Sequence, residues 1–64
     1  MSWQVGERVL YVPTHASGKT DHKDCEKGTI TSIPAGKRDR VFVTYDNAPN
    51  TPKLTYTWNL EPIT

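Results

Sequence analysis

One stretch decides the fold: Arg40-Val41-Phe42-Val43-Thr44-Tyr45, in which β-branched and aromatic residues follow one another without a break. This composition is typical of a β-strand, in which successive side chains point to opposite faces of the sheet. The alternation places Val41, Val43 and Tyr45 on one face, which we expect to be the core, and Phe42 on the outer face. A domain organised around such a strand is predicted to be all-β.

Similar short runs recur along the chain, each bounded by Gly, Pro, Asn or Asp. The further predicted strands are Glu7–Val12, Gly28–Ile33, Leu54–Trp58 and a last short strand at Ile63. Residues 13–27 form a long polar connection, with room for one helical turn near Asp21–Cys25, and Asn59–Pro62 is typical of a single helical turn. The sequence therefore predicts a small five-stranded barrel, with a long loop between strands 1 and 2 and a short helical turn before the last strand.

The composition sets limits on this domain. The 64 residues are enough for a single domain, spanning 1–64, and a hydrophobic content of 34% allows only a thin core. The net charge of +1 is too balanced to indicate nucleic-acid binding by itself. Cys25 is the single cysteine, which favours a reducing compartment. Without a signal peptide pattern or an apolar run of membrane-spanning length, we expect a cytoplasmic protein with no membrane contact.

The order of short motifs resembles that of SH3-like small barrels of the Tudor and KOW type. The matching segments are Gly6–Tyr11, Gly28–Ile33, Val43–Asp46 and Leu60–Ile63. This resemblance implies a scaffold that is used mostly for binding. The segments Gly6–Ala16 and His22–Gly28 are also similar to short uncharacterised proteins encoded by bacteriophages and prophages.

Enzymatic alternatives lack their key residues. Gly6–Val9 is similar to the start of the plasmid-borne, trimethoprim-resistant dihydrofolate reductases, whose pore depends on a Val-Gln-Ile-Tyr motif. Here Leu54–Thr57 stands in the nearest place without the glutamine, so that activity is not carried over. A nucleophilic pair of Cys25 and His22 would need an oxyanion hole and an orienting group, and neither is evident. We therefore expect no enzyme activity.

The long loop carries the residues with metal-binding chemistry. His15, His22 and Cys25 could bind zinc, with Asp21 or Asp24 completing a set of four ligands. The spacing His-x6-His-x2-Cys is not a standard zinc motif, however. The alternative is a solvated loop in which Cys25 is a small buried apolar group, and we expect no metal or cofactor.

The aromatic residues exceed what so small a core can bury: Trp3, Tyr11, Phe42, Tyr45, Tyr56 and Trp58. Tyr11 and Tyr45 are expected in the core, whereas Tyr56 and Trp58 share a face that could be inner or outer. We predict a non-enzymatic binding module, a monomer or small homo-oligomer, that docks on a host protein as a phage-type accessory or inhibitory factor. The residues predicted to bind the protein partner are His15, His22, Phe42, Tyr56 and Trp58.

Basic residues supply a second hypothesis for function. Lys37, Arg38 and Arg40 cluster at the predicted turn before the third strand, and Lys53 could lie near them. Mobile cations of this kind contact phosphates in nucleic-acid complexes. The alternative function is therefore a nucleic-acid-binding barrel that uses these four residues.

Overall fold

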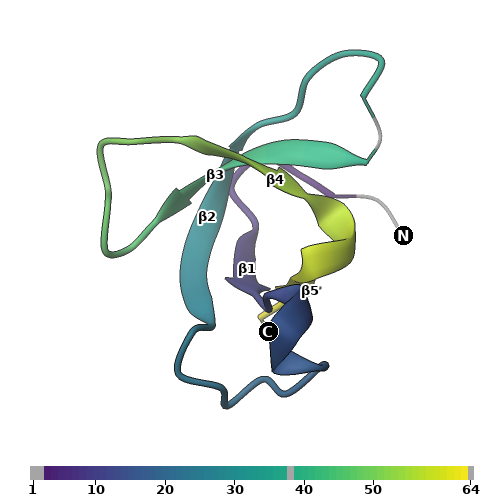
Figure 1. Ribbon diagram of the computed structural model, residues 1–64. Coiled ribbons are helices and arrows are strands. Elements are labelled where there is room, and N and C mark those ends of the chain that lie inside the picture. The colour runs from purple at the N-terminus through teal and green to yellow at the C-terminus, as the bar shows by residue number, and fades with distance from the viewer. Residues whose placement is uncertain (1–2, 38, 64) are drawn as a thin grey trace.

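The computed structural model describes residues 3–37 and 39–63 and confirms an all-β fold. Five antiparallel strands form one curled sheet in the order β4-β3-β2-β1-β5 (Figure 1). The elements are β1 (Arg8–Tyr11), the 3-10 turn η1 (Thr14–Ala16), β2 (Glu26–Ser32), β3 (Arg40–Tyr45), β4 (Lys53–Tyr56), the 3-10 turn η2 (Thr57–Asn59) and β5 (Leu60–Pro62). In this part of the chain, no helix is long and apolar enough to cross a membrane.

The two short helical turns lie at other residues than the sequence indicates. The long loop between β1 and β2 is confirmed, and its 3-10 turn is at Thr14–Ala16. Near Asp21–Cys25, where the sequence leaves room for a helical turn, the chain forms separate hydrogen-bonded turns instead. The short helical turn before the last strand is confirmed, but it spans Thr57–Asn59 and so begins two residues before the predicted Asn59–Pro62. Leu60–Pro62 instead pairs with β1, and the proline is tolerated because β5 is an edge strand.

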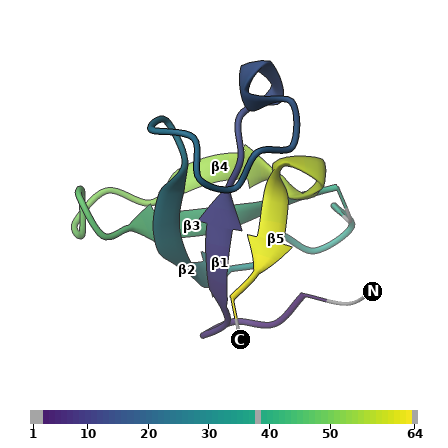
Figure 2. The same ribbon diagram turned by 90° about the horizontal axis from the view of Figure 1, so that it is seen from below.

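The turn η2 spans the gap between the two edge strands β4 and β5. The Thr57 amide donates to the Asp39 carbonyl beside β3 at 2.9 Å, and the Val12 amide after β1 donates to the Asn59 carbonyl at 2.7 Å. The Asn59 side chain also donates to the Val12 carbonyl at 2.9 Å. Figure 2 shows the resulting curl, with β1 between β2 and β5 and with β3 and β4 behind them. The sheet is thus held in its curved form at both ends of η2.

The core lies on the concave face of the sheet. Its buried members are Val9, Ile30, Val41, Val43, Tyr45 and Leu60, with Trp3 and Tyr11 packed partly against them. The predicted inner face of β3 is therefore confirmed. Gly28 in β2 permits a close crossing of β3, because a Cβ there would lie 2.7 Å from Val43 Cγ1 and 2.9 Å from the Thr44 carbonyl oxygen.

Candidate functional site

The outer face of the β3–β4 pair carries large apolar side chains. The register opposes Phe42 to Leu54 and Arg40 to Tyr56, and directly opposed residues share one face of a sheet. Leu54 is 51% exposed and Tyr56 44% exposed, whereas Thr55 between them is buried. Strand β4 therefore turns its apolar residues to solvent and its threonine to the core.

The turn η2 adds a tryptophan to this face. Trp58 is 68% exposed, and its ring is stacked on Tyr56 with centroids 4.3 Å apart and planes at 10°. Because the chain leaves the extended conformation after Tyr56, Trp58 is carried beside that ring. The name aromatic surface is used below for Phe42, Leu54, Tyr56 and Trp58.

One cation is attached to the aromatic surface. The Arg40 guanidinium carbon lies 5.1 Å from the centroid of the Tyr56 ring, within the range of a cation–π contact. Asp39 orients this guanidinium, since Arg40 Nε donates to Asp39 Oδ1 at 3.1 Å. The same hydrogen bond lowers the pKa of Asp39 and raises the pKa of Arg40. Both groups therefore stay charged over the physiological range.

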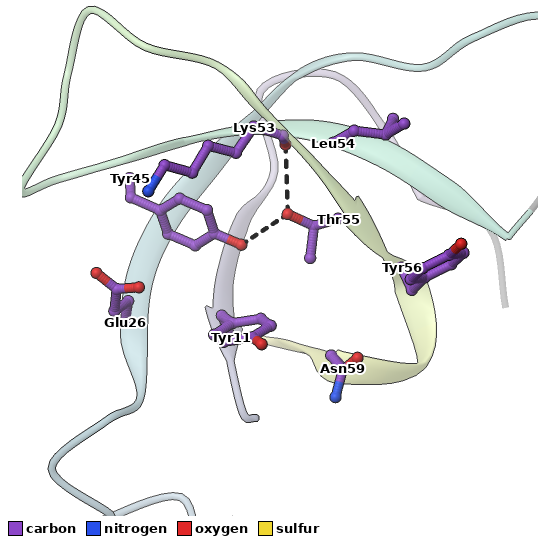
Figure 3. Close-up of a pocket in the computed structure, with 8 residues that line it drawn as sticks. All are labelled: Tyr11, Glu26, Tyr45, Lys53, Leu54, Thr55, Tyr56 and Asn59. Atoms are coloured by element: carbon purple, nitrogen blue, oxygen red, sulfur yellow. Dashed lines mark hydrogen bonds between the residues drawn. The ribbon is translucent and has the colours of Figure 1, made fainter. Parts of the chain in front are cut away.

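A groove of about 290 Å³ lies along β4, where Leu54 and Tyr56 line it together with the inner-face residues Tyr45 and Thr55. Figure 3 shows the Tyr45 hydroxyl and Thr55 pointing toward one another in this groove, with Leu54 pointing away from them. The two oxygens are 2.9 Å apart, and Thr55 Oγ1 in turn donates to the Lys53 carbonyl at 3.3 Å. Tyr45 is thereby left as the donor to Thr55, and burial raises its pKa. The Tyr45 and Thr55 hydroxyls therefore satisfy each other's hydrogen-bonding capacity on the inner face, which is a structural role and not a reactive one.

A second groove connects the aromatic surface to the long loop. It is lined by Val12, Pro13, Thr14, Gly18, Trp58, Asn59 and Glu61. Trp58 thus borders the loop on one side and Tyr56 on the other. The long loop and Trp58 are therefore neighbours.

The predicted protein-binding residues fall into two groups. Phe42, Tyr56 and Trp58 belong to the aromatic surface, whereas His15 and His22 lie in the long loop with their ring centroids 5.3 Å apart. Leu54 joins the aromatic surface although it was not among the predicted binding residues. Its two-residue spacing from Tyr56 was the signal that could have found it.

The predicted nucleic-acid-binding residues are not gathered on one face. Arg40 is tied to Asp39 and Tyr56, and Lys37 is an exposed residue of the turn between β2 and β3. Lys53 opposes Val43 at the far end of the β3–β4 pair, so it shares the face of Val43 and not that of Arg40. Arg38 lies outside the described residues.

Comparisons of this chain with protein-family models, with curated proteins and with solved structures find no match. The resemblances to SH3-like barrels and to phage proteins therefore stay predictions.

Proposed function

We propose that this chain is a non-enzymatic binding module that docks on another protein through the aromatic surface. The observation that carries the proposal is the contact series from Arg40 to Tyr56 to Trp58 on an exposed face. Tryptophan, tyrosine and arginine are the residues most enriched among those that dominate binding energy at protein interfaces. All three are present here as neighbours.

The arrangement favours binding because it exists before any partner arrives. Stacking against Tyr56 restricts the Trp58 ring, and Asp39 restricts Arg40. Side chains that are already ordered lose less conformational entropy on association, which otherwise costs about 0.5–1.5 kcal/mol for each immobilised side chain. Leu54 and Phe42 extend the apolar area along the strands. A partner with a complementary apolar pocket would bury this area.

The resemblance to phage-encoded proteins supplies the class of partner. On the basis of that resemblance, the proposed partner is a protein of a bacterial host, which this chain would assist or inhibit. The proposed partner contact is the aromatic surface together with the adjoining part of the long loop, which meets Trp58 in the second groove.

Affinity capture from a bacterial lysate tests the proposal. The comparison uses the wild type, a Tyr56→Ala/Trp58→Ala double variant, and a Val5→Ala control that removes another exposed apolar side chain, 63% exposed. We expect the wild type and the control to recover the same protein. The double variant should bind it at least about 30-fold more weakly, since one dominant interface residue contributes about 2 kcal/mol or more.

Two results would count against docking on a host protein. Equal recovery by the double variant would move the interface away from the aromatic surface. Sedimentation equilibrium gives the second result. If the wild type self-associates and the double variant does not, the aromatic surface binds a second copy of this chain and not a host protein.

Nucleic-acid binding is the second candidate, and its dependence on salt separates it from protein docking. For a phosphate-binding protein, log affinity falls linearly with log salt, with a slope close to the number of phosphates neutralised. A Lys37→Gln/Lys53→Gln variant should then lower that slope. Because Arg40 is engaged by Asp39 and Lys53 lies on the opposite face, we expect titration with a single-stranded oligonucleotide at low salt to give no saturable binding.

A further inference from the structure

The long loop is an ordered chain of turns. A series of backbone hydrogen bonds, each spanning three residues, joins Pro13 to Ala16, Thr14 to Ser17, Ala16 to Lys19, Lys19 to His22 and His22 to Cys25. Ser17 and Gly18 make the sharpest change of direction, with φ of 54° and 80°. Ala16 is buried and fastens the loop to the barrel. The loop thus holds its side chains in a defined arrangement.

This arrangement brings three ligand-bearing side chains together. His15 Nε2 lies 2.7 Å from Asp24 Oδ2, and His22 Nδ1 lies 3.9 Å from the same oxygen. One ligand atom from each residue lies within 4.8 Å of those of the other two. The Asp24 amide donates to His22 Nδ1 at 3.0 Å and sets the orientation of that ring, and a metal ion bound at Nδ1 would replace this amide at the same lone pair. Both histidines of the chain therefore meet one carboxylate.

We propose that His15, His22 and Asp24 form a binding site for Zn²⁺, with the fourth position open to water. Imidazole nitrogen and carboxylate oxygen are zinc ligands, and three protein ligands with one open position is an established zinc arrangement. Ligands about 2.0–2.2 Å from a tetrahedral zinc lie roughly 3.3–3.6 Å from one another. The observed separations from Asp24 Oδ2, 2.7 Å to His15 and 3.9 Å to His22, bracket this value. Zn²⁺ is therefore admitted by movements of the exposed His15 and Asp24 side chains that also release the Asp24 amide from His22 Nδ1.

Of the ligands that the sequence suggested, His15, His22 and Asp24 come together, and Cys25 is not part of the group. The Cys25 thiol is directed to the Lys19 carbonyl oxygen, at 3.3 Å, and so contributes to the turn from Lys19 to Cys25. The carboxylate is instead directed at His15. The site therefore has two nitrogens and one oxygen as donors, which suits zinc better than the oxygen-seeking Mg²⁺.

Calorimetric titration of the purified protein with Zn²⁺ tests the site, and imidazole NMR signals of the two histidines report on it directly. We expect saturable binding of one ion per chain, with both histidine signals shifting and with no competition from Mg²⁺. Loss of a supporting group alone weakens metal sites about 10–100-fold. His15→Ala and the near-isosteric Asp24→Asn should therefore weaken binding by about 100-fold or more.

Cys25→Ser is the matched control in the same loop, and it should bind Zn²⁺ as the wild type does. A Co²⁺ complex should show no thiolate charge-transfer absorption. Thermal unfolding without metal confirms that each variant is folded. The proposal is overturned by unshifted histidine signals, by undiminished binding to the folded Asp24→Asn variant, or by loss of binding in Cys25→Ser. None of these readouts depends on a protein partner.

Discussion

Strands β3 and β4 lie side by side, and side chains alternate between the two faces of the sheet in both. The two strands differ in which face, inner or outer, carries their large apolar residues. In β3 the inner positions are apolar, with Val41, Val43 and Tyr45 buried. In β4 the inner positions are Lys53 at the exposed end of the strand and the buried Thr55, while Leu54 and Tyr56 face solvent. One strand thus supplies the core, and the other supplies a surface.

The contrast shows where apolar side chains stabilise the fold and where they are available for binding. Apolar area that is buried in the monomer already contributes to its stability, at about 25 cal/mol per Å². The area on β4 contributes little until something covers it. The inner threonine is explained by its neighbour, since Tyr45 brings a buried hydroxyl that needs a partner. The outer Leu54 and Tyr56 have no such role in folding.

The largest expected effect is the difference between matched truncations on the two strands. Val43→Ala, at a fully buried position, should lower the free energy of unfolding by about 2–3 kcal/mol, from lost burial and a residual cavity. Leu54→Ala removes more atoms but should change it by only about 1 kcal/mol, because the side chain is half exposed. Urea unfolding measures both. If both variants lowered the free energy of unfolding by similar amounts, the proposed difference between β3 and β4 would be contradicted.

The next prediction concerns the hydrogen bond between Tyr45 and Thr55, which joins β3 and β4 on the inner face. Thr55→Val leaves the Tyr45 hydroxyl without a partner, and we expect it to cost about 1–3 kcal/mol. In the Tyr45→Phe background the same substitution should cost clearly less, because no hydroxyl then remains to be satisfied. A double-mutant cycle in urea measures this coupling. Additive effects would show that the hydroxyl pair contributes nothing.

Tyr45 in β3 and Asp39 just before it should also respond to opposite ends of the pH scale. Burial raises the pKa of Tyr45 above 10.0, so its contribution to stability is full below pH 10 and is lost as the pH rises through the folded pKa. Arg40 lowers the pKa of Asp39 below 3.8, so that contribution is present above this pH and is lost as the pH falls through the folded pKa. In unfolding measured across pH, Tyr45→Phe should flatten the alkaline limb and Asp39→Asn the acid limb. Unchanged limbs would contradict the assignment of these groups.

The smallest expected effect on stability belongs to Trp58, which has the largest side chain of the aromatic surface. Trp58→Ala should alter the midpoint of thermal unfolding only slightly, corresponding to about 0.5 kcal/mol or less, because the ring is mostly exposed. A large loss of stability would mean that Trp58 works mainly as packing for η2. The aromatic surface would then be a structural feature.

Much of the fold could be predicted because local composition and tertiary structure agree in β3. Val41, Val43 and Tyr45 alternate cleanly, and their burial follows from that pattern alone. In β4 the alternation was equally clean, but the choice of face could not be predicted. That choice depends on the register with β3, and on Tyr45 needing Thr55 as a partner, which are long-range facts.

For the candidate sites, the sequence predicted most of the residues but not how they are arranged in space. The sequence indicated His15, His22 and Cys25 as possible ligands and left open whether Asp21 or Asp24 would complete the set, whereas the structure brings Asp24 to the two histidines and turns Cys25 to the Lys19 carbonyl. Which side chains meet depends on the course of the loop. Ser17 adopts a positive φ in that loop although it is not a glycine, and no local sequence pattern predicts this. The position of Trp58 beside Tyr56 likewise depends on η2, where the sequence indicated a continuing strand.

The emission of Trp58 tests the use of the aromatic surface most directly. The chain has two tryptophans, so in a Trp3→Phe variant Trp58 is the only indole. The emission of the free variant should be that of a water-exposed indole, open to acrylamide quenching. Saturation with the protein captured by the wild type should shift the emission to shorter wavelength and protect it from the quencher. An indole already shielded in the free variant, or one that the bound partner leaves unchanged, would contradict the account.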